Sequence, residues 1–356
     1  MDIQTKIQNK QDFNFKFADA PFDSNGVLSP GWAEPTYDDF FTRMVETPVL
    51  LNQSTVLPMT AIQHDLDMLT ANVELDSQRD ISTGQSIGLT PNETAPGLLR
   101  KQLVAQPLQA KTIITDNFLE ENIEGDRFMD TYLNILADSM GPAFERFGIF
   151  SDKNVTTVSG EGTGYRTTDG LLSQLKAISS NASNPNYGLA KLIHRDRVGE
   201  GVLDAIERYV EQDGNISNAT CVLPPQIYAR LMIEIAQEKE TDLGDAVYQN
   251  GEITQILGIT IVQDNIIRET RNGYNTMKFD DDGEYSSTGT AVDKMLYGFI
   301  GQPNNVVFGM MRDFEVRNQW EIDVLGYKVA LLCKGDAKIL WDQDTLAIPF
   351  TMNNQD

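Results

Sequence analysis

The chain has 356 residues, which at about 100–200 residues per domain suggests roughly two folded units. Apolar residues make up 40% of it, enough for a hydrophobic core. Its 28 basic and 52 acidic residues leave a net charge of −24, and every segment is acidic. This charge argues against a protein that neutralises many phosphates with Lys and Arg. It is typical of a soluble acidic surface, and it also suits a wall that encloses DNA without gripping it.

Two cysteines, Cys221 and Cys333, lie far apart among apolar neighbours. This pattern predicts buried reduced thiols instead of a disulfide framework or a metal site. The N-terminal segment is polar and lacks the apolar core of a signal peptide. No apolar run reaches about 18 residues, so no membrane-spanning helix is expected. We therefore expect the chain to be made and kept in a reducing cytoplasm.

The first part of the chain predicts an arm and two short elements. Residues 1–36 are polar with isolated aromatic residues, and we interpret them as an extended arm that docks on another surface. A short helix is expected from Tyr37 to just before Pro48, because a residue that precedes proline is disfavoured in a helix. Alternation of apolar and polar residues predicts a strand over 61–75, with one slip near Leu69 that suggests a bulge.

A long polar stretch follows this strand. Ser, Thr, Gly, Pro and Asn dominate residues 77–97, and a second strand-like run covers 98–114. We interpret the two runs as a long two-stranded arm with a mobile tip. Because an isolated hairpin is only marginally stable in water, such an arm should be held by a neighbouring molecule, as in an assembling protein. Deleting residues 77–97 should then leave a folded subunit that does not assemble.

Two helices are predicted from apolar periodicity. The longest helical pattern covers 126–147, where an apolar residue recurs every three to four positions, and Pro142 should kink it. A second helix is expected over 199–212. Its buried face should consist of Val202, Leu203, Ile206, Tyr209 and Val210.

The middle and end of the chain differ in character. A strand over 219–223, a helix over 226–238 and a strand over 258–264 together predict an α/β unit. Residues 305–350 are strongly strand-prone and predict antiparallel β-structure that closes the fold. The fold class expected from these patterns is α+β.

The chain contains two histidines, and neither indicates a catalytic or metal site. His64 precedes Asp65 and Asp67, but side chains on a strand alternate between faces, so His64 shares a face with neither carboxylate. We interpret it as a solvated strand residue. His194 lies among opposite charges and is expected at the surface. No nucleophile motif such as G-x-S-x-G occurs near either histidine.

Two further patterns have the wrong spacing for a ligand site. The glycines of 160–164 do not match the dinucleotide fingerprint, and a flexible turn is expected there. The acidic run 280–284 would need calcium ligands at the positions of Lys278 and Gly289, so we expect an acidic hairpin tip. No catalytic, cofactor-binding or metal-binding residue is therefore predicted, although carboxylates from distant segments could converge in the fold.

The order of these elements resembles the major capsid proteins of tailed bacteriophages, which have the Hong Kong 97-type fold. Residues 61–106 are similar to the extended loop of that family. The stretch 111–150 resembles the strand that leads into the long spine helix, with an acidic run at 118–121 where the family often has one. The strands and helix between 218 and 264 resemble the axial domain, and 306–323 resembles the return into the peripheral domain.

The resemblance implies an α+β, Hong Kong 97-type organisation in four parts. These are an N-terminal arm over 1–60, an extended β-hairpin loop over 61–106, a peripheral domain with the spine helix over 107–165 and 305–356, and an α/β axial domain over 166–304.

The resemblance also implies a structural protein, not an enzyme, that self-assembles through pentamers and hexamers into an icosahedral head enclosing double-stranded DNA. Expected partners are copies of itself, a portal protein, and a separate scaffold protein because few residues precede the loop. No cofactor, membrane or sequence-specific DNA contact is expected. Some members cross-link a loop lysine to an asparagine of a partner subunit, and Lys101 is the candidate because it is the only lysine in 61–106. A solvating surface charge is the other interpretation of Lys101.

Two alternatives come from other classes. A cellular nanocompartment shell, encapsulin-like, has the same fold and encloses protein cargo. A hydrolase or carbohydrate-binding protein would use a dispersed carboxylate site. Gel filtration separates a shell, which elutes in the void volume, from an enzyme that elutes as a small oligomer.

Overall fold

The computed structural model describes residues 47–70, 97–117, 126–155, 163–180, 187–237, 248–249, 252–253, 255–268, 277–286, 288–292 and 295–352. Internal contacts separate two units. Unit 1 comprises residues 1–45, 109–138 and 314–332, and unit 2 comprises 46–108, 139–313 and 333–356. The N-terminal arm before residue 47, the helix expected after Tyr37, the tip of the arm at 77–96 and the acidic run at 118–121 lie outside the described residues.

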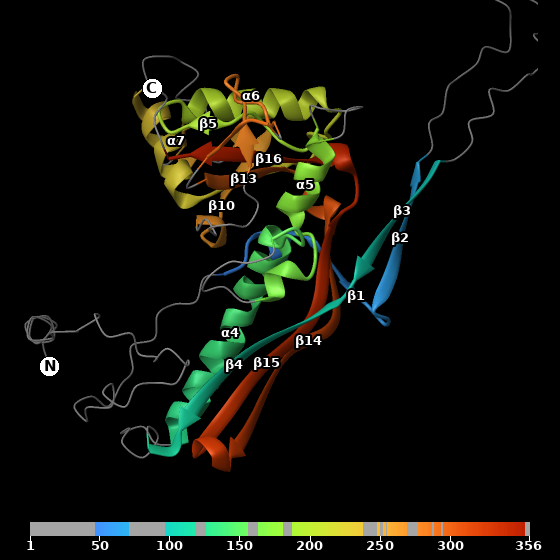
Figure 1. Cartoon of the computed structure of the whole chain (residues 1–356). Coiled ribbons are helices and arrows are strands. Elements are labelled where there is room, and N and C mark those ends of the chain that lie inside the picture. The colour runs from blue at the N-terminus through green and yellow to red at the C-terminus, as the bar shows by residue number, and fades with distance from the viewer. Residues whose placement is uncertain are drawn as a thin grey trace, which may run out of the picture. The chain divides into compact units, whose positions relative to one another are not determined.

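The centre of unit 2 is a six-stranded sheet with the strand order β5-β16-β13-β6-β10-β9 (Figure 1). β13 pairs antiparallel with β16, whereas β6 and β10 run parallel. β13 and β16 are buried almost throughout, which explains why their sequences are continuously apolar. The strands are β5 Ile193–His194, β16 Thr345–Thr351, β13 Met295–Gly301, β6 Thr220–Leu223, β10 Ile259–Gln263 and β9 Gln255–Ile256.

Three helices accompany this sheet in unit 2, namely α5 Leu171–Ser179, α6 Val198–Glu211 and α7 Pro225–Gln237. α7 connects β6 to the parallel strand β10, which confirms the predicted strand, helix and strand. Pro225 occupies the first position of α7, where the missing backbone N–H has no intrahelical acceptor to lose.

α6 buries one apolar stripe at helical spacing, formed by Val198, Val202, Ala205, Ile206 and Tyr209. The prediction that Leu203 and Val210 also lie on the buried face is wrong, because each is 45% exposed. Each of them follows a buried residue by one position and is therefore turned by about 100° away from the stripe. Apolar character alone thus overstated the width of the buried face.

The helix α4, Asp126–Phe150, confirms the pattern predicted for 126–147 and ends three residues later. Pro142 lies inside it. The end of α4 belongs to unit 2, where Phe144, Phe147 and Phe150 are buried. The ring of Phe144 lies 5.8 Å from that of Phe308. Aromatic packing therefore holds the end of this helix to the start of a long strand.

The strand-prone end of the chain forms β-structure, as predicted. β14 Val306–Glu321 and β15 Gly326–Ile339 are the central strands of a four-stranded sheet of order β1-β14-β15-β4. The outer strands are β1 Thr55–Pro58, parallel to β14, and β4 Gln106–Thr115. In unit 1, Leu325 before β15 has a left-handed backbone with φ of +46°, and its carbonyl accepts a hydrogen bond of 2.8 Å from the Asp116 N–H.

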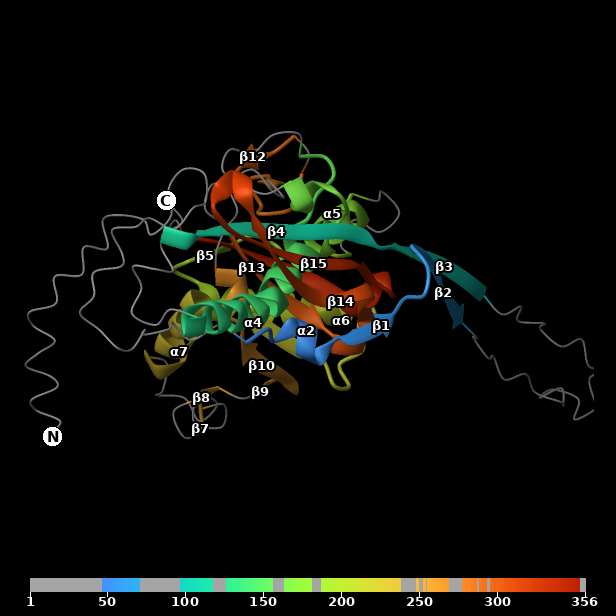
Figure 2. The same ribbon diagram turned by 90° about the horizontal axis from the view of Figure 1, so that it is seen from below.

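β2 Gln63–Thr70 and β3 Gly97–Val104 form a separate two-stranded antiparallel sheet (Figure 2). Their register is continuous from Gln63 opposite Val104 to Thr70 opposite Gly97. The predicted two-stranded arm is therefore confirmed over β2 and β3. The expectation that the second run continues in the arm as far as 114 is wrong, because residues 106–114 lie in β4 of the four-stranded sheet. The bulge suggested near Leu69 is wrong, because Leu69 pairs in regular register with Leu98.

Shorter elements complete the described chain, and they are α2 Leu50–Gln53, η2 Thr163–Arg166, β7 Tyr248–Gln249, β8 Glu252–Ile253, η3 Ile266–Arg268, β11 Lys278–Phe279, β12 Thr290–Ala291, η4 Pro303–Asn305, η5 Ile322–Val324 and η6 Asp342–Asp344. No helix in the described ranges combines the length and apolar character needed to cross a membrane.

Candidate functional site

The β2–β3 hairpin presents an apolar pair to solvent at its outer end. Leu69 and Leu98 lie directly opposite each other and are 69% and 60% exposed. Residues opposite each other in an antiparallel pair share a face, so the two leucines form one apolar patch. Leu99 on the other face is 51% exposed. The outer end of the hairpin therefore offers apolar surface on both faces.

The face that carries Leu69 and Leu98 becomes polar toward the root of the hairpin. Asp67 lies opposite Arg100, and the Asp67 Oδ1 to Arg100 Nε distance is 2.6 Å. One pair further along, Gln102 Nε2 donates a hydrogen bond of 2.9 Å to Asp65 Oδ1. These exposed cross-strand pairs favour the observed register over one shifted by a residue.

The root of the hairpin is anchored by apolar packing within unit 2. Leu103 is fully buried and packs in a cluster with Met59, Ala105 and Val307. Gly309 on β14 lies against this cluster so closely that a Cβ there would be 2.6 Å from Met59 Sδ and 2.9 Å from Leu103 Cδ1. The absence of a side chain at 309 is therefore what lets Leu103 and Met59 pack beside β14.

Lys101, the predicted cross-link candidate, bonds within its own subunit. Its Nζ donates a hydrogen bond of 2.9 Å to the Ile339 carbonyl and lies 2.6 Å from Asp342 Oδ1. The Lys101 and Asp342 side chains are 30% and 48% exposed, so solvent screens this ion pair substantially. In this position Lys101 is a second anchor between β3 and the end of β15.

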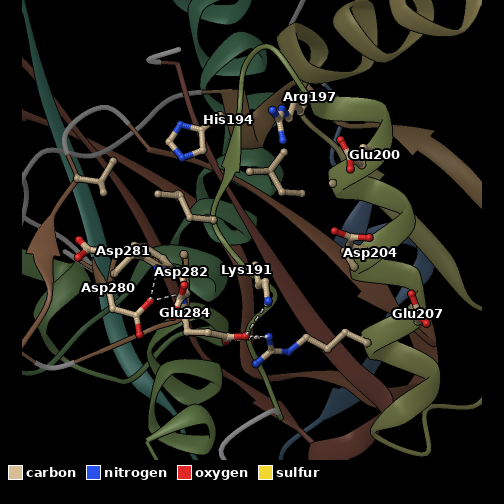
Figure 3. Close-up of a pocket in the computed structure, with 18 of the residues that line it drawn as sticks. Lys191, His194, Arg197, Glu200, Asp204, Glu207, Asp280, Asp281, Asp282 and Glu284 are labelled. Atoms are coloured by element: carbon tan, nitrogen blue, oxygen red, sulfur yellow. Dashed lines mark hydrogen bonds and ion pairs between the residues drawn. The ribbon is translucent and has the colours of Figure 1, made fainter. Parts of the chain in front are cut away.

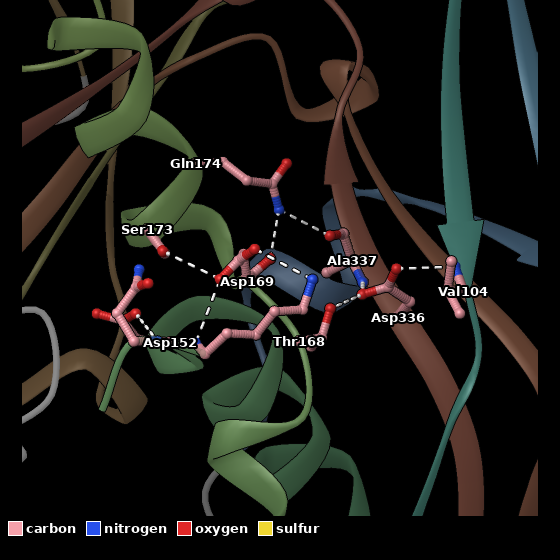
Figure 4. A network of polar contacts seen from close by, with 10 residues as sticks. Val104, Asp152, Thr168, Asp169, Ser173, Gln174, Asp336 and Ala337 are labelled. Carbon is pink, nitrogen blue, oxygen red and sulfur yellow. Dashed lines mark hydrogen bonds and ion pairs between the residues drawn. The ribbon is translucent and has the colours of Figure 1, made fainter. Parts of the chain in front are cut away.

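The third anchor is a buried carboxylate on β15, missed by the sequence reasoning. Asp336 is 1% exposed, and its Oδ2 accepts a hydrogen bond of 2.9 Å from the Val104 N–H at the end of β3 (Figure 4). Its Oδ1 accepts bonds from the Thr168 hydroxyl at 2.6 Å and from the Ala337 N–H at 3.0 Å. Three donors satisfy the buried charge, which is the condition under which such a group is tolerated.

The same polar network continues into α5. Gln174 Nε2 donates to the Asp169 carbonyl at 2.7 Å and to the Ala337 carbonyl at 2.9 Å, as Figure 4 shows. Its Oε1 accepts a bond of 3.2 Å from the Ile339 N–H. The Asp169 carboxylate in turn forms an ion pair of 3.2 Å with Lys153, just after α4. The root of the hairpin, β15, α5 and the end of α4 are thus connected by hydrogen bonds.

A second feature of unit 2 is an open cleft of about 860 Å³ beside α6 and β5 (Figure 3). The run 280–284 borders it as the predicted acidic hairpin tip, closed by a 3.0 Å hydrogen bond from the Asp280 N–H to the Glu284 carbonyl. Arg208 donates to both Glu284 carboxylate oxygens, at 2.9 and 2.8 Å. The cleft is mostly acidic, and its basic groups near this tip already have carboxylate partners.

The two histidines and two cysteines have no shared site. His64 lies on β2 opposite Leu103, and His194 is half-buried on β5, not fully at the surface as predicted. Cys221 and Cys333 are free and buried, as predicted. In the described part of the chain, no three His, Cys, Asp or Glu residues are placed to hold a metal ion.

Comparison with known proteins agrees with this architecture. No protein-family model matches the chain. The chain is 23% identical over 325 residues to a prophage capsid protein of Bacillus subtilis strain 168, YqbE, and the alignment covers 90% of this chain and 92% of the relative.

Solved capsid structures share the fold. The capsid of cyanophage P-SCSP1u matches with a TM-score of 0.56 at 13% identity, covering 90% of this chain and 93% of the other. The capsid of Myoviridae phage XM1 matches with a TM-score of 0.54 at 12% identity, covering 92% and 99%. The fold expected from the order of elements is confirmed.

Proposed function

We infer that this chain, which has the fold of tailed-phage major capsid proteins and a full-length relative among prophage capsid proteins, is the structural subunit of an icosahedral phage head. Its role is to form a shell, not to catalyse a reaction. The observation that carries this proposal is the β2–β3 hairpin, which is firmly anchored at its root and apolar at its exposed outer end.

The hairpin supports assembly for a physical reason. A two-stranded sheet with exposed leucines gains stability when another surface covers it. We propose that the Leu69–Leu98 patch of one subunit packs on a different surface of the next copy, so that the contact is heterologous. Heterologous contacts that close give rings, and we propose pentamers and hexamers that tile the shell. Many weak contacts then act together through multivalency.

The proposed content of the shell is double-stranded DNA. A net charge of −24 repels phosphates, so the wall would confine a genome without binding it tightly or reading its sequence. We further propose that separate scaffold and portal proteins direct assembly in the host cytoplasm, where reducing conditions keep Cys221 and Cys333 as thiols. A shell of the same fold that holds protein cargo is the alternative outcome of the tests below.

The assembly proposal is tested by removing the apolar patch. The double variant Leu69→Thr/Leu98→Thr keeps β-forming residues at two exposed positions, so the subunit should fold with unchanged stability. We expect it to fail to form shells in electron micrographs. Gln63→Thr is the matched control, because it changes an exposed residue on the same face near the root of the hairpin and should assemble. Normal shells from the double variant would overturn the role given to the hairpin.

The cargo proposal has its own readout. Shells purified from infected or induced cells and treated with nuclease should retain protected DNA. Shells that contain only protein would support the nanocompartment alternative and contradict the phage-head proposal.

A further inference from the structure

Two buried carboxyl groups lie together in unit 2, apart from the hairpin root. Glu145 on α4 and Asp264, which directly follows β10, are both fully buried, and their carboxyl groups lie within hydrogen-bonding reach of each other. Two carboxylates that have both lost their protons repel each other and have no donor to share. A hydrogen bond between them therefore requires one proton.

Each carboxyl group also holds a different segment of the chain. Glu145 Oε2 accepts a hydrogen bond of 2.9 Å from the Leu51 N–H in α2. Asp264 Oδ1 accepts one of 2.8 Å from the Ile266 N–H at the start of η3, and the Asp264 N–H donates to the Leu223 carbonyl at 3.0 Å. The pair thus joins α2, the first described helix of the chain, to α4 and to the turn after β10.

We propose that Glu145 and Asp264 share one proton in the folded subunit and form an alkali-sensitive carboxyl latch, which holds the turn after β10 to α4. Loss of the proton places two charges in the same buried space, and separating the turn after β10 from α4 relieves the repulsion. The latch is distinct from the hairpin contacts, and it operates whether or not the subunit is part of a shell.

The electrostatics agree with this geometry. Burial, then the hydrogen bond and the charge of Asp264, raise the pKa of Glu145 from 4.5 to about 9, against the opposing hydrogen bonds from the backbone of Leu51 and Leu50. Between these two values the folded subunit keeps a proton that the unfolded chain has lost. The latch therefore contributes its full stabilisation below the unfolded-state pKa of 4.5. This contribution decreases as the pH rises toward the folded-state pKa of about 9.

The test compares wild-type subunit with Glu145→Gln. The amide keeps an oxygen for the Leu51 N–H and supplies an N–H for Asp264 without a titrating proton. Relative to this variant, the folded-to-unfolded ratio of the wild type should fall by up to about tenfold per pH unit between about pH 4.5 and 9. Glu200→Gln, which removes the same charge from an exposed position, should keep the wild-type pH dependence.

A local readout separates the latch from general alkaline damage. Hydrogen exchange of peptides containing η3 and the turn after β10, expressed as the wild-type rate over the Glu145→Gln rate, should rise with pH, while the ratio for β13 peptides should rise less. If Glu145→Gln does not fold, Asp264→Asn makes the same comparison. Parallel pH profiles for wild type and the folded variant would overturn the proposal.

Discussion

The backbone N–H of Val104 donates a hydrogen bond of 2.9 Å to the carboxylate of Asp336, a residue 232 positions later in the chain. This bond connects the last residue of β3 to β15, at the point where the hairpin leaves the body of unit 2. The direction of the hairpin therefore depends on a buried charge as well as on apolar packing.

Removal of that charge should be costly. Asp336→Ala leaves the donors of Val104, Thr168 and Ala337 without their acceptor, and an unsatisfied buried donor costs about 1–3 kcal/mol. We expect the free energy of unfolding, measured by denaturant titration, to fall by about 3 kcal/mol or more. Thr168→Val removes one of the three bonds and should cost about 1–2 kcal/mol. Equal losses in the two variants would show that Asp336 does not hold the other two donors.

Met59 and Leu103 pack so close to Gly309 that a side chain at this position should destabilise the subunit. Gly309→Ala places a methyl group 2.6 Å from Met59 Sδ, and overpacking of this kind costs about 1–3 kcal/mol. Gly141→Ala is the matched control inside α4, where the new Cβ would meet Pro48 at an ordinary 3.5 Å. It should stabilise the subunit by about 0.5–1 kcal/mol, because alanine is the better helix former. Thermal unfolding of both variants distinguishes the two environments.

The internal bonds of Lys101 bear on cross-linking. Its Nζ is held by Asp342 and the Ile339 carbonyl of its own subunit, so the side chain is directed away from an asparagine of a partner subunit. We predict that boiled, reduced shells migrate on a denaturing gel as a single chain of 39.7 kDa. Lys101→Met should cost about 1 kcal/mol or less. A ladder of higher bands that disappears in Lys101→Met would instead establish Lys101 as the cross-linking residue.

Both thiols should be unreactive in the folded subunit. Burial raises the pKa of Cys221 to about 12 and that of Cys333 to about 11, so the reactive thiolate is scarce at neutral pH. In the native protein, neither cysteine should therefore react with a thiol reagent such as iodoacetamide. In the denatured protein both cysteines should react, as mass spectrometry would show. Rapid labelling of the native subunit would contradict the burial of these residues.

Local sequence patterns predicted most helices and strands, because residues that are buried on one side of an element recur at the period of that element. The alternation in 61–75 predicted β2, and the periodicity of 126–147 predicted α4. The strand-like run 98–114 predicted strand structure that the fold divides between β3 and β4. The same reasoning failed for Leu203 and Val210, since a hydrophobic residue beside a buried stripe looks identical in sequence to one inside it.

The polar anchors were not predictable in this way. Asp336 lies 232 residues from Val104 and 168 from Thr168, and the fold alone brings them together. Its one signal was an acidic residue inside a strand-prone run that also contains the buried Cys333 and Ile339. The burial of Glu145 was also not predictable, because a glutamate in an amphipathic helix normally lies on the exposed face.

The central claim, that this chain builds a phage head, is tested most directly by electron microscopy of the chain produced together with the proposed scaffold protein. The account predicts closed icosahedral shells in the void volume of a sizing column, with pentameric and hexameric clusters in the reconstruction and the β2–β3 hairpin lying on an adjacent subunit. Discrete small oligomers under these conditions, with the hairpin exposed to solvent, would contradict it.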